Sequence, residues 1–218
     1  GFSILTRSLR ARSAVALGGR FSPEGFLREV ETMGVTLASI VPTMLVQILK
    51  TFPGRKAPAT LRALLLGGAS ASDAWLARAR DAAWPVIATY GMTETASNVT
   101  TTPYAERYSG VVGSGRVNAF AEVRVENGHI LVRGPMRMTG YWGETPLDPE
   151  AWHDTGDIGY FDEAGYLHVE ARRSDLILSG GNNVYPLEVE AALESLPGIR
   201  EALVTGLPDD VWGAFVTA

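Results

Sequence analysis

The first half of the chain alternates between two hydrophobic patterns. Apolar residues recur at helical spacing in four segments: Gly1 to Arg12, Pro23 to Met33, Pro42 to Lys50 and Ser72 to Ala82. Compact apolar runs predict four strands: Ala14 to Leu17, Val35 to Val41, Leu61 to Leu66 and Val86 to Thr89. Strands that alternate with helices imply an α/β fold, with a mostly parallel sheet whose faces are covered by flanking helices.

The pattern changes after Gly110. Short alternating strands follow, with turns at residues 126–129 and 162–165, which predicts a small β-rich subdomain over residues 111–173. A composition shift near Ser174 marks the next boundary. Residues 174–218, with a helix from Leu187 to Leu196, are expected to begin a small α+β C-terminal domain that stops early.

Composition narrows the class of protein. The 218 residues are 46% hydrophobic, which is typical of an ordinary globular protein. A net charge of -5 argues against a nucleic-acid partner, and no apolar run approaches the ~20 residues of a membrane helix. The absence of cysteine excludes disulfides and is compatible with the cytoplasm. The large aromatic residues Trp75, Trp84, Tyr141 and Trp142 are expected in the core.

Polar residues follow two of the predicted strands where α/β sheets bind ligands. Gly67-Gly68-Ala69 follows one strand, and the turn Tyr90-Gly91-Met92-Thr93-Glu94 follows another. Each stretch also has a simpler interpretation. The glycines make a tight turn in many proteins, and the second stretch could be a helix cap that carries a solvated glutamate.

A second group of polar residues lies in the β-rich segment. Asp157 stands on a glycine turn, where a carboxylate can accept two ribose hydroxyls, and Arg172 follows fifteen residues later with a forked set of donors. Asp157 could instead be a plain turn residue, and Arg172 a surface partner of Glu170 or Asp175. Their joint spacing favours the ribose interpretation.

Six motifs together resemble one known family. They occur between Leu64 and Glu190 in the order LLLGGAS, YGMTET, VVGSG, ILVRGPMRMTGYW, HDTGDIGYFDEAGYLHVEARRSDLI and SGGNNVYPLEVE. This order resembles that of the adenylate-forming acyl-CoA synthetases, which also include luciferases and the adenylation domains of peptide synthetases. The resemblance covers essentially the whole chain. Asn182 and Ala171 depart from it, since many relatives carry glutamate and glycine there.

The resemblance implies specific roles. The nucleotide would be bound by residues of three motifs: Gly67, Gly68, Ala69, Tyr90, Gly91, Met92, Thr93, Asp157 and Arg172. Thr93 would contact phosphate and Glu94 would hold the magnesium ion, so these two are the predicted catalytic residues. Gly91 would also line the acyl pocket. Gly180 and Gly181 would flank the pantetheine arm of coenzyme A, although a hairpin bend is the alternative, and Ser174 would be the hinge of a rotating C-terminal domain.

The reaction implied by the resemblance has two steps. A carboxylate attacks the α-phosphate of ATP to give an acyl-adenylate and pyrophosphate, and the thiol of coenzyme A then displaces AMP to give a thioester. The family also uses a lysine-bearing phosphate loop and a C-terminal lysine, neither of which is found here, since Lys50 and Lys56 fall in scaffold elements. The chain is therefore expected to be a fragment that is inactive alone.

The substrate prediction also comes from resemblance. ARRSDLILSGG and the later GLPDDVWG most resemble ligases that act on o-succinylbenzoate in menaquinone biosynthesis. In some of these an arginine at the place of Arg7 faces the acyl pocket, where it would neutralise the second carboxylate of the substrate. Medium-chain or aromatic acyl-CoA synthetases remain the alternative, as does a truncated, non-catalytic nucleotide-binding or interaction module. The expected partners are a small carboxylate, ATP and coenzyme A, and self-association is left open.

Overall fold

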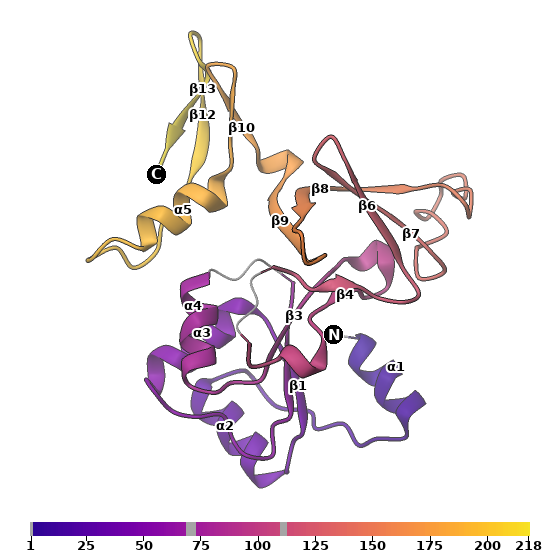
Figure 1. The fold of residues 1–218 in the computed structure, drawn as a ribbon, viewed down its shortest axis with the longest axis vertical. Coiled ribbons are helices and arrows are strands. Elements are labelled where there is room, and N and C mark those ends of the chain that lie inside the picture. Colours follow the sequence, from indigo (N-terminus) through magenta and orange to yellow (C-terminus); the bar gives the residue numbers. More distant parts are fainter. Residues whose placement is uncertain (1, 69–72, 110–112) are drawn as a thin grey trace. The chain divides into compact units, whose positions relative to one another are not determined.

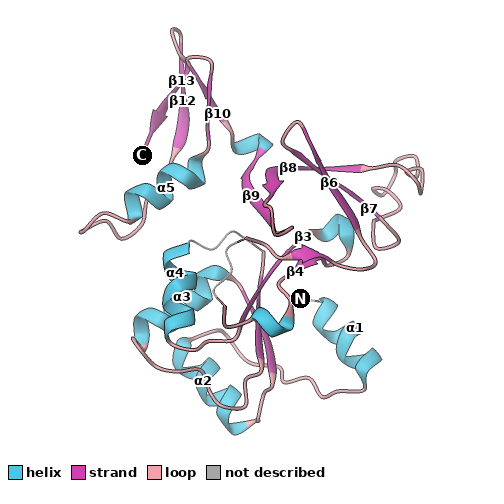
Figure 2. Ribbon diagram, in the orientation of Figure 1, coloured by secondary structure: helices cyan, strands magenta, loops and turns pink. Residues whose placement is uncertain are grey.

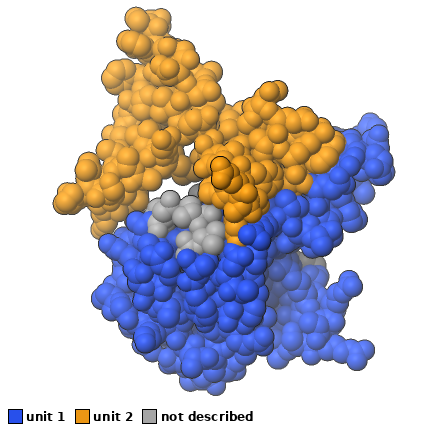
Figure 3. Space-filling model, viewed as in Figure 1, with its two compact units in different colours: residues 1–122, 133–151 blue, residues 123–132, 152–218 orange. Residues whose placement is uncertain are grey.

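The computed structural model describes residues 2–68, 73–109 and 113–218. Two compact units make up the chain, and Figure 3 colours them separately. One unit comprises Gly1–Glu122 and Arg133–Ala151, and the other comprises Val123–Val132 and Trp152–Ala218. The predicted boundaries after residues 110 and 173 stay predictions.

The first unit is built on a five-stranded sheet (Figures 1 and 2). Its strand order is β1-β2-β3-β4-β5, with β1 to β3 parallel and β4 and β5 added in antiparallel fashion. The strands are β1 (Leu37–Ile40), β2 (Ala63–Leu66), β3 (Val86–Gly91), β4 (Asn98–Thr101) and β5 (Arg116–Val117). The helices are α1 (Phe2–Ala11), α2 (Pro23–Thr32), α3 (Pro42–Thr51) and α4 (Asp73–Asp81), with short 3-10 turns η1 (Thr93–Thr95) and η2 (Tyr104–Glu106). The predicted α/β class is confirmed.

One hydrophobic core lies between the sheet and three of these helices. The cluster draws on α2, α3, α4, β1 and β2, and its members are Leu27, Val30, Ile40, Leu45, Ile48, Leu49, Leu61, Leu64, Leu66, Ala79, Ala82 and Trp84. Local signals place the helices correctly. Ser22 caps α2 by accepting a hydrogen bond from the N–H of Gly25 at 3.1 Å, and Pro23 opens the helix.

The second unit contains a four-stranded sheet in the order β6-β7-β8-β9. The strands are β6 (Glu122–Glu126), β7 (His129–Arg133), β8 (His153–Phe161) and β9 (Leu167–Arg172). The 3-10 turn η3 (Arg173–Asp175) follows β9 and leads into two antiparallel hairpins and one helix: β10 (Ile177–Ser179), β11 (Asn182–Val184), α5 (Pro186–Glu194), β12 (Thr205–Asp209) and β13 (Gly213–Thr217).

Two expectations from the sequence are wrong. Ala14 to Leu17 forms an irregular segment rather than a strand, and Leu17 is largely exposed. A short apolar run becomes a strand only where a neighbouring strand and a buried face are available to it. Of the aromatic residues expected in the core, Trp84 is buried, whereas Tyr141 is half exposed and Trp142 is fully exposed. Ser72, the first residue of the helix predicted from Ser72 to Ala82, lies outside the described residues.

Candidate functional site

The carboxyl ends of β2 and β3 lie side by side in the first unit. Leu66 pairs with Ala88, and the hydroxyl of Thr89 donates a hydrogen bond to the carbonyl oxygen of Leu66 at 3.1 Å. A Cβ on Gly67 would stand 2.5 Å from the Thr89 hydroxyl, and Gly68 has a positive φ of +88°. The structure thus brings Gly67 and Gly68 next to the start of the Tyr90 turn.

The turn after β3 is fixed by a threonine that the sequence analysis did not select. The N–H of Met92 donates to the hydroxyl oxygen of Thr95 at 3.1 Å, and this hydroxyl lies 2.7 Å from the carbonyl oxygen of Ser97. Thr95 is only 1% exposed, whereas Thr93 is exposed. Thr95 therefore builds the turn, and Thr93 is the hydroxyl that a ligand can reach. The 3-10 capping pattern around Thr95 is the signal that could have identified it.

Glu94 is held by a second segment of the same unit. The hydroxyl of Tyr141 donates to Glu94 Oε1 at 2.9 Å, and the N–H of Met138 donates to the Glu94 carbonyl oxygen at 2.7 Å. A single oriented carboxylate suits magnesium, which keeps several waters and is bound through one or two carboxylates together with substrate phosphates. The Glu94 carboxylate therefore fits the predicted ion, and Tyr141 is a residue that sequence reasoning assigned to the core.

Gly91 and Arg7 meet the same short segment. Gly91 pairs with Asn98, and a Cβ at Gly91 would collide with the backbone of Ser97 and Asn98. Arg7, on α1, donates to the Asn98 side-chain oxygen at 3.0 Å and to the Ser97 hydroxyl. The close approach of β4 thus explains why position 91 is glycine without any substrate. Within the described part of the chain the Arg7 guanidinium has neutral partners, and no carboxylate binds it.

Asp157 and Arg172 are brought together in the second unit. They face each other on β8 and β9, and Arg172 Nε lies 3.7 Å from Asp157 Oδ1. The Asp157 side chain is 12% exposed and that of Arg172 is 56% exposed. This separation is too long for a hydrogen bond but short enough for electrostatic attraction. The predicted pairing in space is present, and the ribose role is a proposal.

A ladder irregularity sets this pairing. Gly159 pairs with Val169, but the next pair is Ile158 with Ala171, so β9 carries one extra residue there. Without this bulge Arg172 would stand opposite Gly156 and not Asp157. A Cβ at Gly159 would collide with the carbonyl oxygen of His168, so the close strand approach at this point requires glycine. Gly159 is a second residue that the sequence analysis missed.

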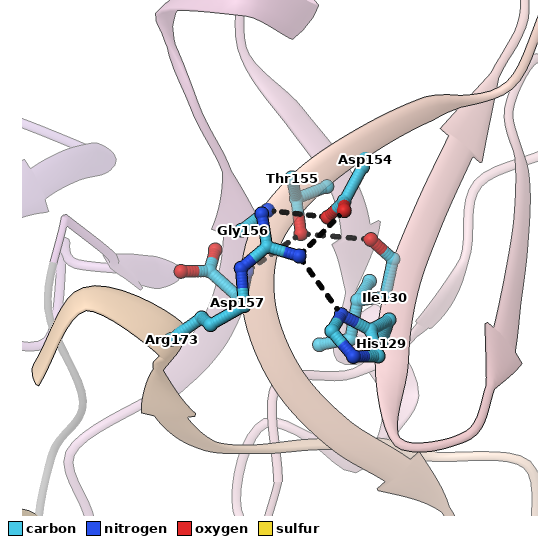
Figure 4. A network of polar contacts seen from close by, with 7 residues as sticks. All are labelled: His129, Ile130, Asp154, Thr155, Gly156, Asp157 and Arg173. Carbon is cyan, nitrogen blue, oxygen red and sulfur yellow. Dashed lines mark hydrogen bonds and ion pairs between the residues drawn. The ribbon is translucent and has the colours of Figure 1, made fainter. Parts of the chain in front are cut away.

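The turn before Asp157 carries a network of polar contacts, shown in Figure 4. Arg173 Nη1 donates to Asp154 Oδ2 at 2.9 Å, and the other Asp154 oxygen accepts from the N–H of Gly156 at 2.8 Å. Partial burial by itself raises the pKa of the Asp154 carboxyl, but the Gly156 N–H and the Arg173 guanidinium outweigh it and hold the pKa below its ordinary value. The carboxylate therefore stays charged at neutral pH.

Gly180 and Gly181 form the two-residue turn of the β10–β11 hairpin. Ser179 pairs with Asn182, and both glycines have positive φ, as a type I′ turn requires. The N–H of Gly180 donates to the Trp212 carbonyl oxygen at 2.8 Å, and a Cβ at Gly180 would collide with the Trp212 ring. A Cβ at Gly181 would meet open space. The hairpin therefore explains both glycines locally, and Gly181 faces open space.

Two predicted residues have little structural description. Ala69 lies outside the described residues, as do Val111 and Val112 of the VVGSG motif. The predicted hinge Ser174 lies in η3, the 3-10 turn that connects β9 to β10. This residue thus stands between two regular strands, although α5 and the C-terminal hairpins belong to the same compact unit as β8 and β9.

The described residues contain no cluster of three or more His, Cys, Asp or Glu side chains arranged to hold a metal ion. No helix in the described ranges has the length and apolar character that a membrane crossing needs.

Comparison with known proteins decides the family. The model of the AMP-binding enzyme family matches residues 3–142, which include the β2 and β3 ends, Glu94 and Tyr141. The chain belongs to the AMP-binding enzyme family. As a family member it carries the predicted Tyr90 turn and both glycines after β2 within the matched range.

Relatives within the AMP-binding enzyme family are similar over the whole chain. A 2-succinylbenzoate–CoA ligase from Listeria monocytogenes is 38% identical over 223 residues, covering 100% of this chain and 48% of the relative. The solved o-succinylbenzoate CoA synthetase (MenE) of Bacillus subtilis, in complex with the acyl-adenylate intermediate OSB-AMP, has a TM-score of 0.89 at 35% identity, covering 99% of this chain and 47% of that one. The same protein in complex with ATP and magnesium has a TM-score of 0.86 at 35% identity, with 99% and 48% covered. The chain thus spans about half the length of the relatives that it matches.

Proposed function

We propose that the protein containing this chain is an ATP-dependent carboxylate–CoA ligase that acts on o-succinylbenzoate. The observation that carries the proposal is the oriented Glu94 carboxylate at the carboxyl end of β3, beside the glycine turn after β2. Ligands bind at this edge of α/β sheets. The relatives named 2-succinylbenzoate–CoA ligase, and the complexes of the Bacillus subtilis protein with OSB-AMP and with ATP and magnesium, support the same assignment.

Residues proposed to contact the nucleotide occur in each compact unit. Gly67, Gly68 and Tyr90 supply the surface for the base, since glycine lets the backbone approach closely. Asp157 accepts hydrogen bonds from the ribose hydroxyls. Arg172 adds positive charge beside Asp157, at 3.7 Å from its carboxylate.

The first half-reaction joins the substrate carboxylate to the α-phosphate of ATP and releases pyrophosphate. Catalysis of phosphoryl chemistry is mainly positioning and electrostatic stabilisation. The exposed Thr93 hydroxyl would donate to a phosphate oxygen, and Glu94, oriented by Tyr141, would hold magnesium. When bound, the ion neutralises charge that develops on the phosphates.

The second half-reaction transfers the acyl group to the thiol of coenzyme A with loss of AMP. The arm of coenzyme A would pass the β10–β11 turn at Gly181, where a side chain would occupy otherwise open space. Ser174, in the short η3 turn, would be the hinge about which the C-terminal domain rotates between the two half-reactions. A cytoplasmic location and self-association stay predictions from the sequence.

Arg7 supports the choice of substrate. o-Succinylbenzoate has two carboxylates, of which only the succinyl one is activated, so its pocket needs a cation for the other. The Arg7 guanidinium lies against Ser97 and Asn98, which pack on Gly91, the predicted wall of the acyl pocket. A guanidinium with neutral partners can bind a carboxylate through two parallel hydrogen bonds. A ligase for simple fatty acids has no use for such a cation.

A panel of carboxylates assayed with ATP and coenzyme A on the whole protein tests the proposal. o-Succinylbenzoate should give the highest kcat/KM. Arg7→Leu should lower kcat/KM for it by about 10- to 150-fold, the loss expected for a hydrogen bond to a charged group. A monocarboxylate of similar size should be spared. Arg10→Leu, on the same helix and exposed, is the matched control.

The outcomes separate the two parts of the proposal. Equal loss on both substrates in Arg7→Leu would mean that Arg7 supports only the fold. Absence of ATP-dependent pyrophosphate exchange with every carboxylate would refute the ligase proposal and favour a non-catalytic nucleotide-binding module.

A further inference from the structure

Two consecutive arginines have different neighbours in the second unit. Arg172 Nε lies 3.7 Å from Asp157, beyond hydrogen-bond range. Arg173 Nη1 instead donates to Asp154 Oδ2 at 2.9 Å and lies 3.2 Å from His129 Nδ1. The contact with His129 is favourable when Nδ1 carries its lone pair. Arg173 is therefore the arginine that β7 and β8 fix in place (Figure 4).

The Asp154 carboxylate connects Arg173 to the next turn of the chain. While Oδ2 binds Arg173, Oδ1 accepts a hydrogen bond from the N–H of Gly156 at 2.8 Å. An aspartate that bonds the backbone two residues ahead closes an Asx turn. Gly156 has a φ of +75°, which glycine adopts without strain.

The turn leads directly into Asp157. The hydroxyl of Thr155 donates to the Ile130 carbonyl oxygen at 2.9 Å and accepts from the N–H of Asp157 at 3.1 Å. Thr155 is buried, so this bond anchors the start of the turn to β7. Asp154 is the more exposed anchor of the two, and its orientation depends on Arg173.

We propose that Arg173 is a positioning residue for nucleotide binding: it fixes Asp154, which closes the turn that presents Asp157. The inference rests on the proposed function, because it takes Asp157 as the group that binds ribose. Arg173 itself touches no nucleotide in this scheme. Its effect is on the geometry of the carboxylate and not on the charge that the nucleotide meets.

The exposure of the pair limits the size of the effect. The side chains of Arg173 and Asp154 are 52% and 41% exposed. Exposed ion pairs contribute little to stability because water screens them. The pair should therefore change the orientation of one turn without changing the fold, and substitutions at either position should give folded protein.

Four variants of the whole protein separate the two bonds of Asp154. Arg173→Gln removes the ion pair. Asp154→Asn also removes it but keeps an oxygen that can accept from the Gly156 N–H. The double variant shows whether the two changes act through one interaction. Asp154→Ala removes both bonds. Arg200→Gln, an exposed arginine of the same unit, is the matched control.

Two measurements are made on each variant. The affinity for AMP is measured by calorimetry, and hydrogen exchange of the segment that contains Gly156 is followed by mass spectrometry without ligand. We expect Arg173→Gln and Asp154→Asn each to weaken AMP binding about two- to five-fold, as an exposed pair allows. The double variant should lose no more than either single variant. Asp154→Ala should lose more affinity for AMP than either single variant. Hydrogen exchange of the segment that contains Gly156 should be faster in the variants that bind AMP more weakly. Arg200→Gln should match the unmodified protein in both measurements.

The two measurements distinguish the possible failures. If the unmodified protein binds no AMP, the proposed function fails, and the exchange data then report only on the turn. If the unmodified protein binds AMP and both single variants bind AMP as tightly as it does, the proposed function stands and the positioning role of Arg173 is wrong. Additive losses in the double variant would also overturn it, because the two residues would then act separately.

Discussion

Replacing Asp157 by asparagine tests the nucleotide site most directly. Asparagine keeps the shape of the side chain but removes its charge, and its amide nitrogen can no longer accept a hydrogen bond. The backbone bond from the Asp157 N–H to the Thr155 hydroxyl is unaffected by the change. The substitution therefore alters what the side chain offers to a ribose and leaves the turn in place.

The expected magnitudes differ for folding and binding. Arg172, the charged partner at 3.7 Å, has a side chain that is 56% exposed, so water can replace the lost carboxylate. Asp157 is largely buried, but the pair is longer than a hydrogen bond and its cation is exposed, so the loss in the free energy of unfolding should stay near about 1 kcal/mol. The loss in binding free energy should be about 1.5 to 3 kcal/mol, the value for a hydrogen bond to a charged group. That loss corresponds to about a 10- to 150-fold increase in Kd.

Calorimetry with an acyl-adenylate analogue on the whole protein measures the change, and thermal unfolding checks the fold. Glu170→Gln is the control, because it removes an exposed carboxylate from β9 in the same unit. A Kd for Asp157→Asn within about two-fold of the unmodified value, with an unchanged Tm, would refute the ribose assignment. A large fall in Tm would instead mean that Asp157 is a structural residue.

Three more substitutions test the roles of Tyr141, Ser174 and Gly159. Tyr141→Phe removes the hydrogen bond that orients Glu94, so the magnesium concentration for half-maximal pyrophosphate exchange should rise about 2- to 12-fold; no change would mean that Tyr141 does not orient the carboxylate. Ser174→Pro restricts φ in η3 and should slow thioester formation more than adenylation in single-turnover experiments; equal slowing would exclude the hinge. Gly159→Ala places a Cβ against the His168 carbonyl oxygen and should lower the free energy of unfolding by about 1 to 3 kcal/mol in denaturant titration; an unchanged value would show that β8 and β9 separate at no cost.

The sequence predicted the elements of the α/β unit well, because hydrophobic period is a local property. The helices from Pro23 and from Pro42 begin at the prolines, where the sequence placed them. The strand predicted from Ala14 to Leu17 does not form. The segment is apolar, but no strand of the described residues pairs with it. The prediction that Tyr141 and Trp142 lie in the core was also wrong, because residue type gives only an average tendency to be buried.

For the candidate site, too, the sequence predicted some features and the structure decided others. Residue type and spacing identified Asp157 and Arg172 as groups suited to a ribose, whereas the roles of Glu94 and the glycine turns came from the resemblance of their motifs to a known family. The pairing of Asp157 with Arg172 depends on the extra residue that β9 carries opposite Ile158 and Gly159. The hydrophobic run that predicts a strand does not show where such a bulge shifts the register.

Only the tertiary structure assigned partners across long stretches of chain. Tyr141 reaches Glu94 over 47 residues, and Arg173 reaches His129 over 44 residues. Neither pair follows from helical or strand period, because the period fixes which face a side chain occupies and says nothing of which distant segment covers that face. The sequence by itself therefore determined the chemistry available to this protein, and strand register and chain packing decided which groups hold one another in position.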